Sequence, residues 1–476
     1  MSRHIKGDIT IRARILISVF SILLISVSRP ASADNIDDYV RKAIKAAHIP
    51  AAAVVVLRAG KPAKIAAYGT ADIEGGVPAT TDTEFQLASA TKLFTGILVM
   101  RMVEEKKLTL ADPVSKYIED TPAKLRDMTI MELASHSSGL PDALTAGPFK
   151  DIRAVRDWAA AQPALAQPSV QSIYSQTEFA LLTQVLERVS GESFDALLND
   201  EIIRPLGLSQ THYAYLEDVT PDPGTSVVSA KLVPRRATAY RWTGSEQLRY
   251  EYTYPEWTHA NAGLFISASD LAKLLEALQG TKLLNAASKE ILTKAYILKD
   301  GKSAPFGVAW IVRRWRNQLA IGHSGGPGYS DIWIYPGRGL SIAVLINAHS
   351  VFPVLADQVA NIADPVNPPA HPQISDNDPA LSKRLENFAA DLGVKGPDTA
   401  LMSPDAVSKL SSLFAMLRPT VSIFGTPKSW QLMAHSVEGN PSRSRSYLAT
   451  YQFGELIWTF GLTSDDKIAS VFAAPD

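Results

Sequence analysis

The chain has 476 residues, 46% of them apolar, and its 47 basic and 48 acidic side chains leave a formal net charge of −1. This composition is typical of a globular protein, and the balanced charge gives no electrostatic support for a nucleic-acid partner. The absence of cysteine excludes disulfides, thiolate nucleophiles and cysteine zinc sites. Because a single core rarely grows beyond about 250–300 residues, we expect at least two folded units.

Residues 1–33 have the pattern of a secretory signal peptide. Two arginines precede a short apolar run at 15–27, and small residues occupy the cleavage positions before Asp34. As a helix this run rises only about 20 Å, less than a hydrocarbon core of ~30 Å, so cleavage after Ala33 is favoured over a retained membrane anchor. The sequence therefore predicts a periplasmic or secreted protein with no stable membrane span after cleavage.

Hydrophobic periodicity predicts the elements of residues 34–360 in chain order. We expect a helix at 35–47, strands at 51–58 and 64–70, a helix from 89 to about 107, mostly helices and loops up to about 284, and strands at 308–312, 319–323, 331–335 and 340–347. Strands at both ends of a segment with helices between them suggest one antiparallel sheet assembled from both ends, with a helical lobe packed beside it.

A proline-rich stretch at 361–380 has the composition of a linker. Beyond it we expect helices at 381–391 and 404–417 and strands at 420–424, 429–437, 445–452 and 455–462, with a fifth candidate at 467–472. The predicted organisation is a signal peptide at 1–33, a first domain at 34–360, the linker, and a small α+β domain at 381–476 whose role the sequence does not reveal.

With thiols absent, a serine is the natural candidate for a nucleophile, and Ser89-Ala90-Thr91-Lys92 offers one. If a helix starts at Ser89, Lys92 lies one turn further on the same face, and the hydroxyl lies at the positive end of the helix dipole. Lysine acts as a base only when its pKa falls from about 10.4 toward 7, a shift that burial can supply. Alone the pattern is weak, because a capping serine beside an exposed lysine looks the same.

A second serine signature, Gly-x-Ser-x-Gly, occurs at 322–326. A nucleophile elbow requires a strand, a sharp turn and then a helix. Here Pro327-Gly328 and another predicted strand follow, so we expect Ser324 to lie on or beside a strand and not to be a nucleophile.

The segment around Ser89 resembles the active-site helix of the serine β-lactamase and penicillin-binding-protein superfamily, in particular its class C-like branch of D-peptidases and esterases. That family's Tyr-x-Asn element resembles Tyr174-Ser175-Gln176, and its Lys-Thr-Gly or His-x-Gly element resembles the segment that begins at His323. Segments 132–141 and 203–208 are similar as well, so the resemblance covers about residues 36–350. It implies an α+β fold with a β-lactamase-like antiparallel sheet and a helical lobe.

The resemblance also implies roles. Ser89 would be acylated, Lys92 would deprotonate it, and Tyr174 would shuttle the proton if cationic neighbours depress its pKa. His323 is expected to join the catalytic group. The residues expected to bind the substrate and form the oxyanion hole are Gln176, Ser324, Gly325 and Gly326. The hole itself would be formed by the backbone N–H groups of Ser89 and Gly326. No metal or cofactor is expected.

Two departures from the family pattern bear on the substrate. Gln176 is one methylene longer than asparagine, so we expect its amide to be displaced by more than about 1 Å, which can cost about 100-fold in rate. His323 replaces a lysine, and a neutral imidazole is a weaker anchor for a carboxylate. A further histidine, His136, is expected to brace a helix end. The aromatic group at 250–259 fits an acyl pocket or strand-edge packing equally well.

These observations favour an exported serine hydrolase, esterase-like, acting on a small-molecule ester. One alternative is a cell-wall D,D-peptidase, D-aminopeptidase or β-lactamase of the same fold, with an amide or peptide substrate. Another is a catalytically inactive binding or sensing protein, which Gln176 keeps open. The natural substrate and the oligomeric state cannot be read from the sequence.

Overall fold

The structure is a computed structural model of the chain. It describes residues 31–214, 216–217, 229–230, 232–250, 254–326, 329–349, 355–367, 370–372, 374–436 and 443–475. The signal peptide expected at 1–33 lies outside the described residues apart from its last three, with which helix α1 (Ala31–Ala46) begins. Of the helices in these ranges, none is long and apolar enough to cross a membrane.

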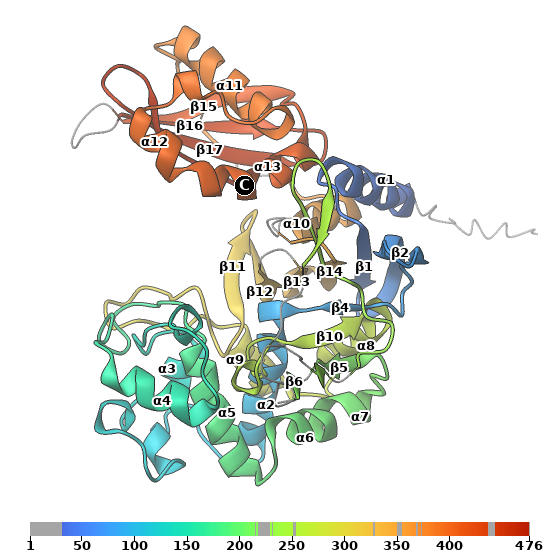
Figure 1. Ribbon diagram of the computed structural model, residues 1–476, viewed down its shortest axis with the longest axis vertical. Helices are drawn as coiled ribbons and strands as arrows, with labels where there is room; N and C mark the ends of the chain where they lie inside the picture. The colour runs from blue at the N-terminus through green and yellow to red at the C-terminus, as the bar shows by residue number, and fades with distance from the viewer. Residues whose placement is uncertain are drawn as a thin grey trace, which may run out of the picture. The chain divides into compact units, whose positions relative to one another are not determined.

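The largest sheet has seven strands in the order β11-β12-β13-β14-β1-β2-β3 (Figure 1). Its strands are β1 (Ala51–Arg58), β2 (Lys61–Asp72), β3 (Val77–Pro78), β11 (Ile311–Trp315), β12 (Gln318–Gly325), β13 (Ser330–Tyr335) and β14 (Leu340–Ile346). Strand β1 pairs antiparallel with β14, so the sheet joins strands from both ends of a long segment. This confirms the predicted α+β fold with an antiparallel sheet.

Strand β1 shows why the sheet lies between two layers. Its first seven residues are all buried, because successive side chains point to opposite faces and both faces are covered. Ala53 and Val55 belong to the core shared with the helices after residue 90, whereas Val54 and Val56 belong to the core shared with α1 and α10 (Leu355–Ala363). The β-branched run of β1 therefore supplies side chains to both cores.

The helices between the two groups of strands include those of the predicted helical lobe and also α8, which packs against β1, β2 and β14. They are α2 (Lys92–Glu104), α3 (Ile130–Ala134), α4 (Ile152–Ala161), α5 (Thr177–Ser190), α6 (Phe194–Leu198), α7 (Arg204–Leu206), α8 (Ala268–Gln279) and α9 (Ala286–Leu292). Short strands accompany them, namely β4 (Glu84–Gln86), β5 (Thr211–Tyr213), β6 (Leu216–Glu217), β7 (Ser229–Ala230), β8 (Tyr240–Trp242), β9 (Gln247–Arg249) and β10 (Leu264–Ser267). Strands of two to four residues are too short to show a period, so the sequence analysis did not predict them.

The C-terminal part contains a four-stranded antiparallel sheet in the order β15-β16-β17-β18. Its elements are α11 (Pro379–Val394), α12 (Pro404–Lys409), α13 (Ser411–Phe424), β15 (Ser429–Ser436), β16 (Arg443–Thr450), β17 (Glu455–Leu462) and β18 (Ile468–Pro475). Phe388 of α11 packs against Phe414 of α13 and Phe460 of β17 within one hydrophobic cluster.

One predicted strand of this part is wrong. Residues 420–424 form the last turns of α13, not a strand. A short apolar run fits either a buried strand or a buried helix, and here Val421 and Phe424 pack in the cluster beneath the helix. The fifth candidate, at 467–472, is confirmed except for its first residue, because β18 begins at Ile468.

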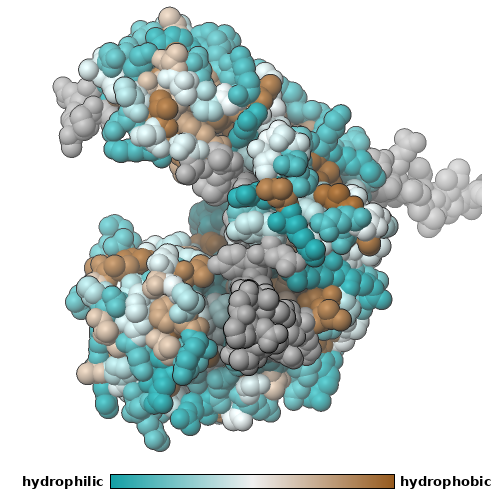
Figure 2. All heavy atoms as spheres, in the orientation of Figure 1, coloured by the Kyte–Doolittle hydropathy of each residue, from teal (hydrophilic) through white to brown (hydrophobic). Residues whose placement is uncertain are grey.

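The surface in view is mainly hydrophilic, with hydrophobic residues in small separate groups (Figure 2). Single exposed apolar side chains are normal on a globular protein. Several of them occur in the segment that leads to Tyr174, where Leu144, Leu165 and Val170 are 46%, 58% and 50% exposed.

Candidate active site

Ser89 lies where the chain enters the predicted helix. It belongs to a short 3-10 turn, η1 (Ala88–Thr91), which runs directly into α2. Ala88 has a φ of +46°, a left-handed conformation that costs a non-glycine residue about 1–2 kcal/mol. Ser89 is partly exposed, whereas Lys92 is fully buried. The turn therefore leaves the hydroxyl accessible to a substrate and encloses the amine.

Lys92 is held by oxygen acceptors from two other segments. Its Nζ donates to Tyr174 Oη and to Gln176 Oε1, each at 2.8 Å, and to the carbonyl oxygen of Asn261 at 3.2 Å. Burial lowers the pKa of Lys92 to about 7, against the opposing effects of the nearby acidic residues Asp142 and Glu178. An amine with this pKa is about half neutral at pH 7, so it can accept a proton there.

Tyr174 connects Ser89 with Lys92. Its oxygen accepts a hydrogen bond from Lys92 Nζ at 2.8 Å, and the nearby side chains of Ser89 and Gln176 act to lower the pKa of the phenol. Burial of the hydroxyl nevertheless raises the pKa of Tyr174 to about 12, although 38% of the side chain is exposed. The condition set for the shuttle role, a pKa depressed by cationic neighbours, is not met, because burial outweighs the hydrogen bonds. Tyr174 is therefore a neutral phenol that can relay a proton.

Gln176 occupies the asparagine position of the family. It precedes α5, its side chain is buried, and its carbonyl oxygen reaches Lys92 Nζ at 2.8 Å. Its backbone N–H donates to Asp142 Oδ1 at 3.0 Å. The extra methylene therefore does not remove the amide from the group around Lys92, and the expected displacement does not break this contact.

His323 lies on β12, and its ring faces Tyr174, with the two ring centroids 6.3 Å apart. Its Nδ1 donates to the carbonyl oxygen of Ser324 at 2.7 Å, which leaves Nε2 as an acceptor. Nε2 has no hydrogen-bond partner among the described residues. Burial and the field of Lys92 lower the pKa of His323 to about 3, so the imidazole is neutral near pH 7.

The glycines after His323 differ in their surroundings. A Cβ on Gly325 would overlap the carbonyl oxygen of Leu87 and the hydroxyl of Ser330, whereas a Cβ on Gly326 would meet nothing within 4 Å. Since Leu87 lies two residues before Ser89, Gly325 allows the end of β12 to approach the serine turn closely.

The side chain of Ser324 does not join the other predicted site residues. As predicted it lies on a strand, where its side chain points to the opposite face from His323 and Gly325. Its hydroxyl donates to Asp331 Oδ1 at 2.8 Å, and Asp331 also accepts from Trp333 Nε1 at 2.6 Å. The predicted role of the Ser324 side chain in substrate binding is therefore at odds with its place on the far face of the sheet.

A buried acid and histidine lie beside Tyr174, and no role for the acid was predicted from the sequence. Glu178, in the first turn of α5, approaches His136 Nδ1 at 2.5 Å, and the exposed fraction of both side chains is 0%. An acidic residue within the apolar start of a helix was the available signal, because carboxylates are rarely buried without a partner. In the part of the chain that the structure describes, no group of three or more His, Asp or Glu residues could hold a metal ion.

The aromatic group at 250–259 contributes backbone and packing. Residues 251–253 lie outside the described ranges. Trp257 is buried and packs against Phe149, with ring centroids 6.0 Å apart. The following segment supplies the Asn261 carbonyl oxygen that accepts from Lys92. This segment therefore supports the lysine through its main chain.

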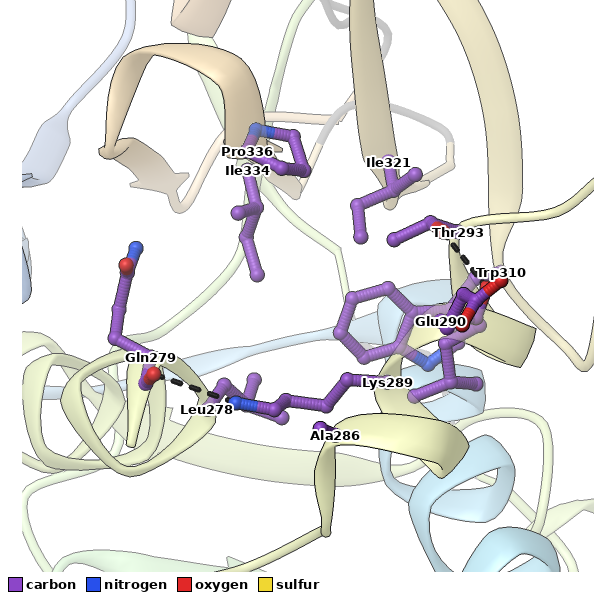
Figure 3. A pocket seen from close by; sticks show the side chains of 11 residues that line it. Leu278, Gln279, Ala286, Lys289, Glu290, Thr293, Trp310, Ile321, Ile334 and Pro336 are labelled. Atoms are coloured by element: carbon purple, nitrogen blue, oxygen red, sulfur yellow. Dashed lines mark hydrogen bonds between the residues drawn. The ribbon is translucent and has the colours of Figure 1, made fainter. Parts of the chain in front are cut away.

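A separate cavity of about 320 Å³ lies between α8, α9 and strands β12 and β13 (Figure 3). Its floor is apolar and includes Trp310, whose indole N–H donates to the carbonyl oxygen of Leu93 in α2 at 3.1 Å. Lys289 at its edge donates to the carbonyl oxygens of Gln279 and Gly280. None of the candidate catalytic residues lines this cavity, so it is distinct from the group around Ser89.

Comparison with solved structures supports this fold over nearly the whole chain. The octameric penicillin-binding protein homologue from Pyrococcus abyssi is similar with a TM-score of 0.62 and 18% identity, covering 93% of this chain and 98% of that one. EstCE1, described as a hydrolase with promiscuous acyltransferase activity, is similar with a TM-score of 0.56 and 23% identity, covering 67% of this chain and 94% of that one. The first of these likenesses, which covers 93% of the chain, extends the shared fold into the C-terminal part.

Sequence comparison identifies more direct relatives. Penicillin-binding protein 4 of Amycolatopsis lactamdurans is 26% identical over 367 residues, which cover 68% of this chain and 90% of that protein. Protein flp of Staphylococcus aureus (strain MW2) is 22% identical over 339 residues, and the chain covers 64% of its length. The model of the Beta-lactamase family matches residues 36–364. Because this match spans well over half of the sequence, the chain belongs to the beta-lactamase family and is a serine hydrolase of that fold.

Proposed function

We propose that this chain is an exported enzyme that forms an acyl-enzyme at Ser89 and hydrolyses uncharged esters. The observation that carries the proposal is the hydrogen bond from Lys92 Nζ to Tyr174 Oη at 2.8 Å, in a group where Ser89 influences the phenol and the pKa of the amine lies near 7. Such a group can activate a serine without a histidine and aspartate pair.

In the proposed reaction, Ser89 Oγ attacks the ester carbonyl carbon while its proton passes to Tyr174 Oη and the phenol proton passes to neutral Lys92 Nζ. Tyr174 loses one proton as it gains another, so its high pKa is no obstacle. The leaving alcohol takes its proton back along the same path. Water then attacks the acyl-enzyme with the same groups as base and acid, and the N–H groups of Ser89 and Gly326 would stabilise both oxyanions.

The charges around the path support an uncharged substrate. His323 is neutral near pH 7 and presents a lone pair, so it cannot attract a substrate carboxylate as an ammonium group would. The main chain of Leu144 lies near that of Gln176, because the N–H groups of both residues donate to Asp142 Oδ1, at 3.1 and 3.0 Å, and the Leu144 side chain is exposed. An ester with an apolar acyl group fits these surroundings.

A peptidase or β-lactamase activity is the second candidate. The amide of Gln176 keeps its contact with Lys92, which favours retention of amide recognition in spite of the longer side chain. This candidate is also supported by the 26% identity to a protein that is named penicillin-binding protein 4, from Amycolatopsis lactamdurans. A binding protein without turnover is the third, and the pKa of Lys92 near 7 argues for catalysis over it.

Two further expectations complete the proposal. The basic and apolar pattern of residues 1–33 supports export to the periplasm or the medium after cleavage behind Ala33. A hydrophobic cluster formed by residues from α11 to β18 supports a small separate domain at 381–476. The linker expected at 361–380 is shorter than predicted, because α10 continues to Ala363 and α11 begins at Pro379. The first domain, 34–360, would then contain every residue of the proposed site.

Intact mass spectrometry tests the proposal directly. The protein is incubated with a fluorophosphonate, a p-nitrophenyl ester, a penicillin and a D-Ala-D-Ala peptide in parallel, together with the Ser89→Ala variant. We expect fluorophosphonate labelling at Ser89 and rapid turnover of the ester. A long-lived penicillin adduct without ester turnover would favour the second candidate, and no labelling of folded protein would refute an acyl-enzyme at Ser89.

A further inference from the structure

His136 holds the main chain on both sides of Tyr174. Its carbonyl oxygen accepts from the N–H of Ile173 at 2.7 Å, and its Nδ1 accepts from the N–H of Ser175 at 3.3 Å. Its ring also packs on the Tyr174 ring, with centroids 4.3 Å apart. His136 has a φ of +55°, a conformation that a residue with a Cβ keeps only when its surroundings hold it there.

The contacts of His136 Nδ1 determine where a proton lies. The N–H of Ser175 always donates, so Nδ1 must present its lone pair. Glu178 Oε2 approaches the same nitrogen at 2.5 Å, and two acceptors cannot share a hydrogen bond without a proton between them. Both contacts are accommodated when Glu178 Oε2 carries a proton and donates it to Nδ1. The proton of the neutral imidazole then lies on Nε2, which has no hydrogen-bond partner among the described residues.

The other oxygen of Glu178 fits this assignment. Oε1 accepts from the Ser138 hydroxyl at 2.5 Å and from the Ser138 N–H at 3.3 Å, as the carbonyl oxygen of a carboxylic acid can. The charged or titratable groups that act on the pair are Lys92, Asp142 and His323. Burial raises the pKa of Glu178 well above its usual range and lowers that of His136 well below its own, so both favour their neutral forms.

We propose that the buried acid of Glu178 and the imidazole of His136 form a neutral hydrogen-bonded pair that positions Tyr174 for proton transfer from Ser89. Both are positioning residues, since the contacts described for them are with Tyr174 and its neighbours. This inference rests on the proposed reaction at Ser89. A neutral pair orders the Tyr174 main chain without placing a second charge beside Lys92.

Substitution of Glu178 distinguishes a neutral, protonated acid from a carboxylate whose charge is required. Glu178→Gln retains one carbonyl oxygen for Ser138 and places an N–H where the acid proton lies, so it mimics the neutral acid. Glu178→Leu fills a similar volume without donor or acceptor. Glu187, nine residues further along α5 and bonded to the N–H of Phe194 at 3.0 Å, provides matched controls as Glu187→Gln and Glu187→Leu.

The rates of p-nitrophenyl ester hydrolysis by these variants test the proposal. We expect Glu178→Leu to lower kcat about 100-fold with KM changed less than about threefold, because a shift of reacting groups by roughly 1 Å costs that much. Glu178→Gln should retain kcat within about fivefold. Equal loss of kcat in both Glu178 variants would show that the carboxylate charge is needed and would overturn the proposal.

An infrared difference spectrum gives a readout that does not depend on activity. Wild-type protein should show the C=O stretch of a protonated carboxylic acid near neutral pH, and Glu178→Gln should lack it. No such band in the wild type would overturn the proposal, including where Glu178→Leu does not fold. If the band is present but Ser89 is neither labelled nor acylated, the proposed function fails while the neutral pair stands.

Discussion

The hydroxyl oxygen of Tyr174 lies 2.8 Å from Lys92 Nζ, and burial moves the pKa values of the two groups in opposite directions, to about 12 and about 7. The order of the two values identifies Lys92 as the group that finally holds the proton of Ser89. Tyr174 remains a phenol before and after the transfer. Burial thus prepares both groups by favouring the neutral form of each.

The pKa of Lys92 predicts the pH dependence of the reaction. Only the neutral amine accepts a proton, so kcat/KM should rise with pH through about 7 and then level off. Ester hydrolysis measured from pH 5 to pH 9 under conditions of low substrate gives this curve. A rate that falls across this range would contradict the assignment of Lys92 as the base.

Replacing Lys92 should separate stability from activity. The pKa of Lys92 is about 7 in the folded protein and 10.5 in its usual state, so the unfolded chain binds the proton more tightly. Burying Lys92 therefore lowers the free energy of unfolding. This loss is fully present below pH 7 and disappears as the pH rises toward 10.5. Lys92→Met should therefore abolish ester hydrolysis and raise Tm more at pH 6 than at pH 9. Thermal unfolding of both proteins at the two pH values is the measurement, and an equal Tm difference at both would contradict the shifted pKa.

Two adjacent glycines offer a matched pair of substitutions. Gly325→Ala should destabilise the fold by about 1–3 kcal/mol and lower activity, because its Cβ would overlap Leu87 and Ser330 next to the serine turn. Gly326→Ala meets no atom within 4 Å and should leave Tm within a few degrees of wild type. Thermal unfolding and ester kinetics on both variants check this, and similar Tm values for the two would show that Gly325 is not tightly packed.

Much of the fold and of the site was predictable because the relevant signals are local. The buried run of β1 and the spacing of Ser89 and Lys92 can be read from short windows, and the structure contains both features. Strand alternation alone would also have turned Ser324 away from His323.

Other features depend on contacts between distant segments and could not be predicted. The raised pKa of Tyr174 results from burial in the folded protein, and the pairing of Glu178 with His136 joins residues far apart in the chain. Residues 420–424 show the same limit in secondary structure. Their apolar run takes the conformation that lets Val421 and Phe424 reach the cluster beneath α13.

The position of the Ser324 hydroxyl predicts a small catalytic effect for its removal. Ser324→Ala removes one of several donors to Asp331, at a cost of about 1 kcal/mol of stability, and leaves Ser89 and Lys92 untouched. We expect kcat/KM for the ester within about threefold of wild type, since no contact with the proposed path is lost. Ester kinetics and a Tm measurement on the variant test this prediction. A loss of kcat/KM of about 100-fold would show that Ser324 does take part in substrate binding.

The neutral state of His323 predicts how the enzyme responds to substrate charge. With an imidazole that presents only a lone pair, wild type should hydrolyse an uncharged p-nitrophenyl ester faster than an ester of similar size that ends in a carboxylate. His323→Lys would add an ammonium group that attracts the carboxylate of the anionic ester. If this attraction contributes about 1.4 kcal/mol, the ratio of kcat/KM for the uncharged ester to kcat/KM for the anionic ester falls about tenfold. The added cation also faces Lys92, whose field already lowers the pKa of His323, so the rise of kcat/KM with pH should move below 7. A ratio that favours the anionic ester in wild type would contradict an uncharged substrate, because no neutral imidazole can account for it.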